Sequence, residues 1–588
     1  MLKVSNIVKE YRSENYKSKV LDGVSFEITK PEIVGITGKS GSGKSTLLKI
    51  LRGVVPFDSG SIEICDEIVT PENWESEGRT LKSMTAIHLQ RNFGLWGGPA
   101  IENIIRRLNF KNAGVEALPL KTHHSYEGLY KEAMEILKMV GLEEKALHST
   151  DQLSGGEKQR LVLARQIAAH PKVLLLDEPV TMTGPDTKQE VLDVIKRLKD
   201  ELNIPIIVVS HLPEIHKYIA DRVLFLEDGK IVKDGSPDEV LTLFLKDIAP
   251  KEPLSEIPVL KETVRVENIS KRYALIRVGE VLNIENMSFD VYDGQIVSLI
   301  GSSGAGKTTI MKMMEGLIAP TEGRVVYLYL EKGKEEKGEG KEEKGEKEEG
   351  EWINISDYNE RRIYLRSIIS IMNQEFSMSV NSTVRDQIRF RISMKRKEAV
   401  DNAKAKAESL GISSEALDII YRLPDMATAE KDQVMNELGI PDEIFNELFP
   451  SIPFEDVDSY AVPVFNALNL PLDILDRKPT EISGGEHVRA FIALSLATSP
   501  KYLFLDEPFG DLDPITLRDV TNALKKINKV FNTTIVLVSH HMNFVKEVAH
   551  RALLIDRGNL VMDGDPTEVC DKLIQKSKAV YLLNDFDL

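Results

Sequence analysis

Two nine-residue stretches, GKSGSGKST at residues 38–46 and GSSGAGKTT at residues 301–309, determine how the rest of the sequence is interpreted. Each follows an apolar run of the kind that forms a buried strand, EIVGIT or QIVSLI, and each precedes a helical pattern. A GxxxxGK[ST] sequence between a strand and a helix is a phosphate cradle. Its glycines let the backbone amides turn inward, and the helix N-terminus favours negative charge. The two copies predict two phosphate-binding sites.

Three further motifs occur once in each half, in the same order. The first half carries LSGGEKQR, VLLLDEP and VVSH, and the second carries ISGGEHVR, YLFLDEP and LVSH. The lysines of the two cradles, Lys44 and Lys307, are offset by 263 residues, whereas Asp177 and Asp506 are offset by 329. The chain is therefore a tandem repeat whose second copy has gained 329 − 263 = 66 residues. Apolar runs followed by helical patterns predict an α/β fold with two parallel core sheets, and alternating segments such as KVSNIVKEY predict antiparallel strands at an edge of each copy.

Three prolines near the middle of the sequence mark the boundary between the copies. We expect a first domain at 1–245, a linker at 246–262 and a second domain at 263–588. Residues 331–350, built only from Glu, Lys and Gly, have nothing to bury and are expected to form a solvated loop. The segment 412–470 mixes helical stretches with prolines. It is either an elaboration of a helical lobe or a partner-binding surface.

Composition excludes several classes of protein. With 42% hydrophobic residues the 588-residue chain can build large cores, and its two cysteines exclude a disulfide scaffold or a Cys-rich metal motif within the chain. The net charge of −17 argues against broad binding to nucleic acid. No run approaches the roughly 18 apolar residues of a membrane helix, so we expect a soluble cytoplasmic protein that is not inserted in a membrane.

The motifs also predict individual roles in nucleotide hydrolysis. The cradle lysines are expected to reach the β- and γ-phosphates, and the hydroxyls of Ser45 and Thr308 to bind Mg²⁺. Carboxylates that end a buried strand suit water-mediated Mg²⁺ binding, the role expected for Asp177 and Asp506. The carboxylates that come next are expected to act on the attacking water as general base or to orient it, and a histidine 33 residues further on to contact the γ-phosphate. These candidate catalytic residues are Glu178, Glu507, His211 and His540.

The SGGE motifs together with these residues resemble those of ATP-binding cassette (ABC) ATPases, over nearly the whole chain. The resemblance implies a cassette fold with a helical lobe and two cassettes packed head to tail as an intramolecular dimer. Each ATP then lies between the phosphate loop of one cassette and the signature motif of the other. The phosphate-loop residues implied are Gly38, Ser40, Gly41, Gly43, Lys44, Ser45 and Thr46, and Gly301, Ser303, Gly304, Gly306, Lys307, Thr308 and Thr309. The signature residues implied are Ser483, Gly484 and Gly485 for the Lys44 site, and Ser154, Gly155 and Gly156 for the Lys307 site.

The same resemblance assigns two further pairs of residues. Gln90 and Gln374 are the Q-loop glutamines, which contact the γ-phosphate and Mg²⁺. Tyr11 and Tyr273 stand where the family has an aromatic ring stacked on adenine.

Longer strings point to a partner. LQRNFGLW, EPVTMTGP and the run that starts at LDPITLRDV are similar to those of the component A two family, tandem ATPases of the methyl-coenzyme M reductase activation system in methane-metabolising archaea. The resemblance implies that ATP hydrolysis supports reductive activation of that nickel enzyme, with the reductase and its activation-complex proteins as partners. A fused ATPase subunit of a membrane importer is the alternative, although both phosphate loops are intact here. A regulatory cassette with negligible turnover is a third possibility, against which the intact Glu178 and Glu507 argue.

One departure from the cassette pattern predicts unequal sites. The second copy reads EPFGDLDP and has Asp513 at the D-loop position, where the first copy, EPVTMTGPD, has Gly184. In the head-to-tail arrangement the altered loop borders the Lys307 site, which we therefore expect to be the slower one. Glu178→Gln is expected to remove most of the steady-state ATP hydrolysis and Glu507→Gln much less. Comparable losses, measured separately, would count against the inequality.

Overall fold

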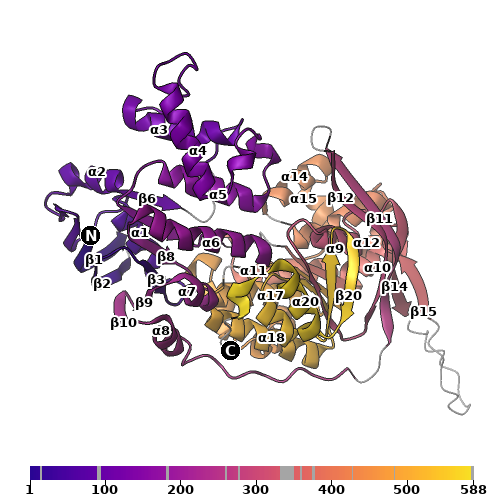
Figure 1. Ribbon diagram of the computed structural model, residues 1–588. Coiled ribbons are helices and arrows are strands. Elements are labelled where there is room, and N and C mark those ends of the chain that lie inside the picture. The colour runs from indigo at the N-terminus through magenta and orange to yellow at the C-terminus, as the bar shows by residue number, and fades with distance from the viewer. Residues whose placement is uncertain are drawn as a thin grey trace, which may run out of the picture. The chain divides into compact units, whose positions relative to one another are not determined.

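The computed structural model describes the chain except for residues 14–15, 89–93, 181–183, 258–260, 276–278, 331–349, 358–359, 374–377, 427, 483, 511 and 584–588. The chain divides into two compact units (Figure 1). The first comprises Met1–Ala249, Asp511–Thr516 and Ile574–Leu588, and the second Pro250–Gly510 and Leu517–Leu573. The predicted low-complexity segment 331–350 lies outside the described residues except for Gly350, which opens strand β15.

The first unit is built on a six-stranded sheet with the order β10-β9-β3-β8-β7-β6. All neighbouring pairs are parallel except β9 and β10. The central strands are apolar and buried along their whole length, as expected for a parallel sheet covered on both faces. The strands are β3 (Ile33–Thr37), β6 (Thr85–His88), β7 (Val173–Asp177), β8 (Ile206–Val209), β9 (Arg222–Glu227) and β10 (Lys230–Gly235).

A second, antiparallel sheet with the order β2-β1-β4-β5 completes the strands described in this unit. It consists of β1 (Leu2–Ser13), β2 (Tyr16–Ile28), β4 (Ser59–Ile64) and β5 (Glu67–Val69). Its apolar face and the core sheet enclose helix α1 (Lys44–Leu51) in one hydrophobic core. Leu47, Leu48, Ile50 and Leu51 are at most 1% exposed, and burial of such a side chain contributes about 1.5–3 kcal/mol. This packing fixes the helix that begins at Lys44.

The remaining helices of the first unit follow the sheet strands or form the helical lobe. They are α2 (Trp74–Met84), α3 (Ala100–Ala113), α4 (Tyr126–Met139), α5 (Gly155–Ile167), α6 (Pro185–Leu202), α7 (Pro213–Ile219) and α8 (Pro237–Phe244), with short 3₁₀ turns η1 (Glu143–Lys145) and η2 (Thr150–Gln152).

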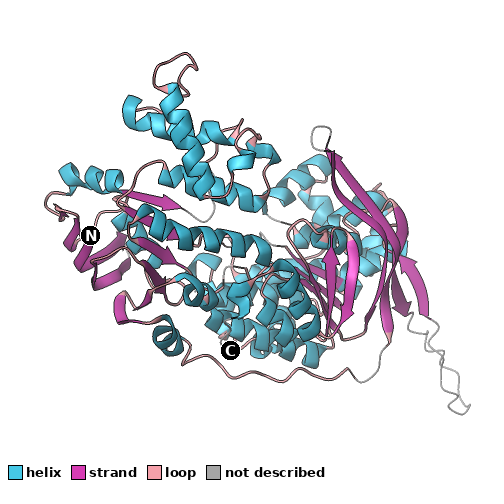
Figure 2. Cartoon of the chain, viewed as in Figure 1, coloured by secondary structure: helices cyan, strands magenta, loops and turns pink. Residues whose placement is uncertain are grey.

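The second unit repeats this architecture strand for strand. Its core sheet has the order β16-β17-β18-β13-β19-β20, again parallel except at β19–β20, and its antiparallel sheet the order β12-β11-β14-β15. The long strands β11, β12 and β14 lie side by side in Figure 2. The strands are β11 (Glu262–Leu275), β12 (Gly279–Tyr292), β13 (Ile296–Ile300), β14 (Glu322–Leu330), β15 (Gly350–Asn354), β16 (Ile369–Met372), β17 (Tyr502–Asp506), β18 (Thr534–Val538), β19 (Arg551–Asp556) and β20 (Asn559–Gly564).

Helices of the second unit fall into those with a counterpart in the first and those of its enlarged lobe. The former are α9 (Lys307–Met314), α10 (Glu360–Ile368), α11 (Val384–Lys395), α16 (Phe454–Ala467), α17 (Gly484–Leu496), α18 (Pro514–Phe531), α19 (Met542–Val548) and α20 (Pro566–Ser577). The latter are α12 (Lys397–Ala407), α13 (Ser414–Ile420), η3 (Leu423–Asp425), α14 (Thr428–Leu438) and α15 (Asp442–Leu448). The 3₁₀ segments η4 (Leu472–Asp476) and η5 (Pro479–Glu481) also belong to this unit, whereas η6 (Val580–Leu583) lies in the C-terminal segment that belongs to the first unit.

The predicted fold is confirmed: two tandem α/β cassettes with parallel core strands, antiparallel strands and helical lobes. The strand order has a direct consequence for the site. Because β3, β8 and β7 are neighbours and run in parallel, the loops that leave their carboxyl ends meet at one edge of the sheet. No helix in the described part of the chain is long and apolar enough to cross a bilayer.

A buried histidine distinguishes the first unit from the second. His216 in α7 is 0% exposed and hydrogen-bonds through Nε2 to the carbonyl oxygen of Ser210 at 2.8 Å. Its ring packs so tightly against Gly35 of β3 that a Cβ there would lie 2.4 Å from Nδ1. The second unit has Ser298 and Val545 at these two positions, so a glycine paired with a large ring is replaced by two side chains of moderate size.

This histidine predicts a loss of stability in acid. Burial lowers the pKa of His216 to about 4 from an unfolded value near 6.5, so the unfolded chain binds the proton more readily. The stabilisation is complete above pH 6.5 and declines as the pH falls from 6.5 to 4, by about 3 kcal/mol at most. Melting curves should show a shallower acid decline in the Gly35→Ser/His216→Val double variant, which copies the second unit. Parallel pH profiles would contradict the prediction.

Candidate functional site

The phosphate loops of both units adopt a conformation that only glycine accommodates. Gly43 and Gly306, which immediately precede α1 and α9, both have φ of 104°. A Cβ on Gly43 would also lie 2.7 Å from the carbonyl oxygen of Val20. The loops therefore place their backbone amides before a helix N-terminus, the arrangement that binds phosphate.

The two cradle lysines lie inside their own loops. Lys44 Nζ donates to the carbonyl oxygens of Gly38 at 2.7 Å and Lys39 at 2.8 Å. Lys307 Nζ makes the equivalent bonds to Gly301 at 3.0 Å and Ser302 at 2.9 Å. Burial lowers the pKa of Lys44, and the carboxylates of Glu178, Asp513 and Asp177 oppose that shift. An ammonium group held this way sits where phosphate oxygens would enter the loop.

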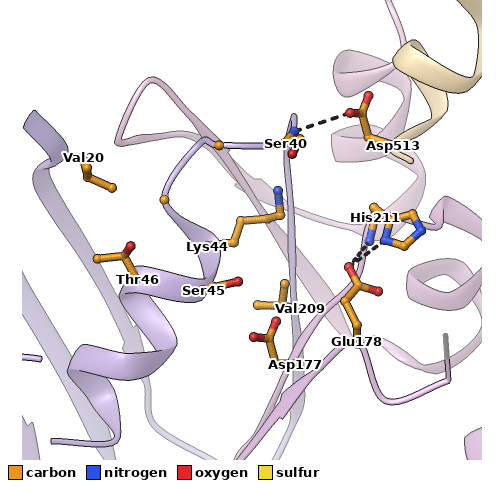
Figure 3. Close-up of a pocket in the computed structure, with 12 residues that line it drawn as sticks. Val20, Ser40, Lys44, Ser45, Thr46, Asp177, Glu178, Val209, His211 and Asp513 are labelled. Carbon is orange, nitrogen blue, oxygen red and sulfur yellow. Dashed lines mark hydrogen bonds and ion pairs between the residues drawn. The ribbon is translucent and has the colours of Figure 1, made fainter. Parts of the chain in front are cut away.

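A hydroxyl and a carboxylate are paired beside each lysine. In the second unit Thr308 Oγ1 donates to Asp506 Oδ1 at 3.2 Å. In the first, Ser45 and Asp177 lie together below Lys44 (Figure 3). Burial and the neighbouring glutamate raise the pKa of both aspartates, while hydrogen bonds from Ser45 and Thr308 oppose the rise. Hydroxyl and carboxylate oxygens at the mouth of a phosphate loop fit Mg²⁺, which takes oxygen ligands from one or two protein groups and from phosphate.

Glu178 has a strained backbone conformation, and its side chain is held by His211. His211 donates to Glu178 Oε1 from its backbone nitrogen at 2.9 Å and lies 2.8 Å from it through Nδ1, and Ser210 Oγ donates to Oε2 at 3.2 Å (Figure 3). Burial raises the pKa of Glu178, but the charge and hydrogen bonds of His211 and the bond from Ser210 outweigh it, so that its net shift is downward. Its φ of 50° lies in the left-handed region, a strain typical of functional sites.

The second unit reproduces this pair with a different histidine atom. Glu507 also has φ of 50°, and its Oε1 lies 2.8 Å from His540, here through Nε2. The backbone nitrogen of each glutamate donates to the strand next to it, Glu178 to Val209 at 3.0 Å and Glu507 to Val538 at 3.1 Å. Glu178 also lines the pocket that contains Lys44 and Asp177, and a carboxylate there has the chemistry to accept a proton from water or to orient it.

Asp513 completes the pocket around Lys44. The segment Asp511–Thr516 belongs to the first unit, and Asp513 lines the pocket together with Lys44, Asp177 and His211. Asp513 Oδ2 accepts from the backbone nitrogen of Ser40 at 3.4 Å, and Oδ1 caps α18 by accepting from Thr516 at 3.1 Å. Gly184, at the corresponding position, precedes α6 with no side chain to offer either contact.

The predicted signature residues lie at helix starts. Ser154 caps α5: its Oγ accepts from the backbone nitrogen of Glu157 at 3.3 Å, and Glu157 Oε2 accepts from that of Ser154 at 2.8 Å. Gly155 and Gly156 open the helix, and a Cβ on Gly156 would lie 2.5 Å from Thr187 in α6, so close helix packing also requires this glycine. In the second unit Gly484 opens α17 and is followed by Gly485.

The other predicted residues are less informative. Gln90, Gln374 and Ser483 lie outside the described residues. Tyr11 on β1 and Tyr273 on β11 are 45% and 42% exposed, and the nearby amines of Lys9 and Lys271 lie 5.4 and 5.9 Å from their ring centroids. The two rings are accessible to a planar ligand.

Ser210 is a site residue that the sequence motifs did not single out. Its hydroxyl donates to Glu178 and accepts from the backbone nitrogen of Leu212 at 3.2 Å. The signal was available, because a serine precedes the histidine in both VVSH and LVSH.

Comparison with known proteins identifies the class to which this fold and site belong. The family model described as ABC transporter matches residues 21–181 and 284–510, and the chain belongs to this family. It is accordingly an ATPase of the ABC type, which hydrolyses ATP to ADP and phosphate, in a family that binds ATP and typically Mg²⁺.

Individual relatives extend the comparison. The chain is 47% identical to the uncharacterized ABC transporter ATP-binding protein MJ1662 of Methanocaldococcus jannaschii, over 99% of this chain and 98% of that protein. It is 31% identical to the methionine import ATP-binding protein MetN of Campylobacter jejuni, over 52% of this chain and 91% of that protein. Among solved structures, the archaeal ribosome recycling factor aABCE1 in complex with the stalk protein aP1 matches 97% of this chain and 92% of that chain, with a TM-score of 0.57 and 18% identity, which shows similarity of fold.

The contacts of Asp513 predict an effect confined to one site. Asp513→Gly, which copies the first D-loop, removes the acceptor for Ser40 and is expected to lower ATP turnover at the Lys44 site about tenfold. Turnover is measured in a Glu507→Gln background that leaves this site active. Loss of the helix cap to glycine costs only about a few tenths of a kcal/mol, so the fold should persist. Asp513→Asn, which keeps the cap, is the control with the smaller loss. Unchanged turnover in Asp513→Gly would refute a role in hydrolysis.

Proposed function

We propose that the protein hydrolyses ATP at two sites, with the residues named above in matching roles. The observation that carries this proposal is the glutamate–histidine pair, repeated in both units with the same φ of 50° beside a glycine phosphate loop. Lys44 and Lys307 bind the β- and γ-phosphates, and Glu178 and Glu507 accept the proton of the attacking water or orient it. His211 and His540 hold these glutamates and contact the γ-phosphate.

The metal site follows from the hydroxyl–carboxylate pairs. Ser45 and Thr308 bind Mg²⁺ directly and Asp177 and Asp506 through water, with Gln90 and Gln374 as further contacts. Mg²⁺ held by these residues would supply positive charge that offsets the negative charge of the phosphate groups. Burial and the neighbouring glutamate raise the pKa of both aspartates, and a divalent ion would favour their ionised form.

We further propose that the two cassettes form an intramolecular dimer that closes on two ATP molecules. Ser483, Gly484 and Gly485 complete the Lys44 site, and Ser154, Gly155 and Gly156 complete the Lys307 site. The capped start of α5 supports this arrangement, because amides at a helix N-terminus favour an anion. Closure of the two cassettes is favourable only when ATP contacts the phosphate loop of one and the signature motif of the other, and hydrolysis removes that connection. Asp513 in the Lys44 pocket supports the proposed inequality of the sites.

The work done by this cycle is proposed to be the reductive activation of methyl-coenzyme M reductase, in complex with other activation proteins. The support is the similarity of LQRNFGLW, EPVTMTGP and the LDPITLRDV run to the component A two family. The chain itself would supply mechanical coupling and no redox centre. Of its two cysteines, Cys65 is exposed and Cys570 is buried, where burial raises the pKa of its thiol to about 12.

A second candidate is the ATPase subunit of a membrane importer. It is favoured by the 31% identity to the methionine import ATP-binding protein MetN, which extends over half of this chain. In this case the partners are integral membrane subunits whose conformation changes when the two cassettes close on ATP.

Capture of partners distinguishes these candidates. A tagged Glu178→Gln/Glu507→Gln protein should retain ATP in the closed state and enrich partners that bind that state, from cells in which the protein is native. The matched control is Lys44→Ala/Lys307→Ala, which should not close on nucleotide. Reductase subunits enriched over this control support the first candidate, and integral membrane subunits support the second. Enrichment of neither class would contradict both.

A further inference from the structure

The enlarged lobe of the second unit carries two aspartates into the protein interior. Helix α16 corresponds to α4 of the first unit at the sequence offset of 329. The helices α12 to α15, residues 397–448, therefore have no counterpart there, and we call them the added segment. The first unit has only turns and loops at residues 114–125, between α3 and α4. Asp418 at α13 and Asp425 at η3 belong to this added segment, and their side chains are 5% and 8% exposed. A buried carboxylate needs cationic partners, and both aspartates have them.

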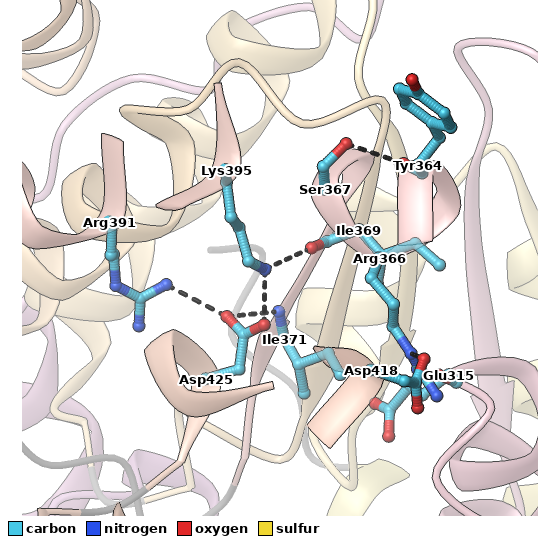
Figure 4. A network of polar contacts seen from close by, with 10 residues as sticks. All are labelled: Glu315, Tyr364, Arg366, Ser367, Ile369, Ile371, Arg391, Lys395, Asp418 and Asp425. Carbon is cyan, nitrogen blue, oxygen red and sulfur yellow. Dashed lines mark hydrogen bonds and ion pairs between the residues drawn. The ribbon is translucent and has the colours of Figure 1, made fainter. Parts of the chain in front are cut away.

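Each aspartate forms ion pairs with two buried basic side chains, which lie on α10 or α11. Asp425 lies 3.1 Å from Arg391 and 2.5 Å from Lys395, both on α11 (Figure 4). Asp418 lies 3.0 Å from Arg362 and 3.1 Å from Arg366, both on α10. Loss of one partner from such a pair leaves an uncompensated buried charge, so α13 and η3 are held firmly to α10 and α11.

The ion pair of Asp425 and Lys395 supports the edge of the core sheet. Strand β16 is the outermost strand and pairs with β17, so its outer backbone groups need other partners. Lys395 Nζ donates to the carbonyl oxygen of Ile369 at 2.6 Å, and Asp425 Oδ1 accepts from the backbone nitrogen of Ile371 at 3.5 Å (Figure 4). β16 leads directly into Gln374, and β17 ends at Asp506. The added segment therefore fixes the strand next to β17, in which Met372 pairs with Leu505, the residue before Asp506.

The ion pair of Asp418 and Arg366 contacts the C-terminal end of α9, the helix that begins at Lys307. Arg366 donates to the carbonyl oxygens of Glu315 and Gly316, the latter at 2.7 Å, just past the end of α9. A cation at a helix C-terminus is favourable, and here Asp418 holds it in place. In the first unit the donor and the acceptor are exchanged between the two helices. Arg52, at the position of Glu315, donates to the carbonyl oxygen of Lys82 at 2.6 Å. That link uses no residue of an added segment.

The first unit also satisfies the α11 arginine differently. Arg107, at the position of Arg391, pairs with Glu116 at 3.2 Å in the loop that follows α3. The contact between an inserted acid and the strand that leads to the Q-loop is thus a feature of the second unit among the described residues.

We propose that Asp425 is a positioning residue for ATP hydrolysis at the Lys307 site, which it influences by fixing β16 through Lys395. The proposal rests on the ATP-site roles given above. It makes the added segment a part of the Lys307 site and not an independent appendage. It also implies that movement of this segment alters turnover at that site and leaves the Lys44 site unchanged.

The experiment measures each site separately in the full-length protein. In a Glu178→Gln background, which reports the Lys307 site, Asp425→Asn is expected to lower kcat for ATP hydrolysis about tenfold with little change in KM. In a Glu507→Gln background, which reports the Lys44 site, the same substitution should have no effect. Glu443→Gln, an exposed carboxylate on α15, is the control and should leave both sites unchanged.

Two further measurements keep the outcome decisive. Asp425→Glu retains the charge and should recover most of the turnover. Lys395→Met, which removes the other half of the pair, replaces Asp425→Asn if that variant does not fold. Normal kcat in the variant that breaks the pair, or equal losses at both sites, would overturn the positioning role. If instead Glu178→Gln and Glu507→Gln leave hydrolysis intact in otherwise native protein, the proposed ATP sites are themselves wrong.

Discussion

The proposed hydrolysis depends on a carboxylate that stays ionised although it is largely buried. Glu178 is buried, and burial alone would favour its neutral form, which could neither accept a proton nor orient water. The contacts of His211 and the hydroxyl of Ser210 reverse that preference. The positive φ of the glutamate is the backbone conformation in which this pairing occurs. Strand order provides the rest, because only adjacent parallel strands place the glutamate after β7 and the histidine after β8 at one edge.

Pattern and spacing were sufficient for the parts of the structure that depend on local sequence. The apolar runs before GKSGSGKST and VVSH became β3 and β8, and the glycine spacing gave the turn at Gly43. The offset of 329 aligned α5 with α17 and Asp177 with Asp506. These features are predictable because burial periodicity and steric limits on φ act over a few residues.

Features that depend on distant partners were not predictable. Asp418 and Asp425 have the sequence context of exposed helix and turn residues, and charged residues are mostly exposed. Their burial follows from arginines and a lysine 30 to 56 residues away in the chain, a pairing that no local pattern encodes. The same holds for the histidines: VVSH and LVSH look alike, yet His211 uses Nδ1 and His540 uses Nε2. Side-chain choice of this kind is decided by packing.

The differences between the two copies occur around a preserved centre. The phosphate loops, the paired carboxylates and the glutamate–histidine contacts are the same in kind. Around them the corresponding positions differ: Asp513 stands where the first copy has Gly184, Val545 where it has His216, and Glu315 where it has Arg52. The last two exchanges each come with a second change at a contacting position, Ser298 for Gly35 and Arg366 for Lys82. In a homodimer every substitution enters both sites at once. Fusion into one chain removes that restriction, because a residue that suits one site is no longer imposed on the other. Buried charges such as those of the added segment are costly to acquire one at a time, so their accumulation on one copy is consistent with a site that has diverged toward a separate task.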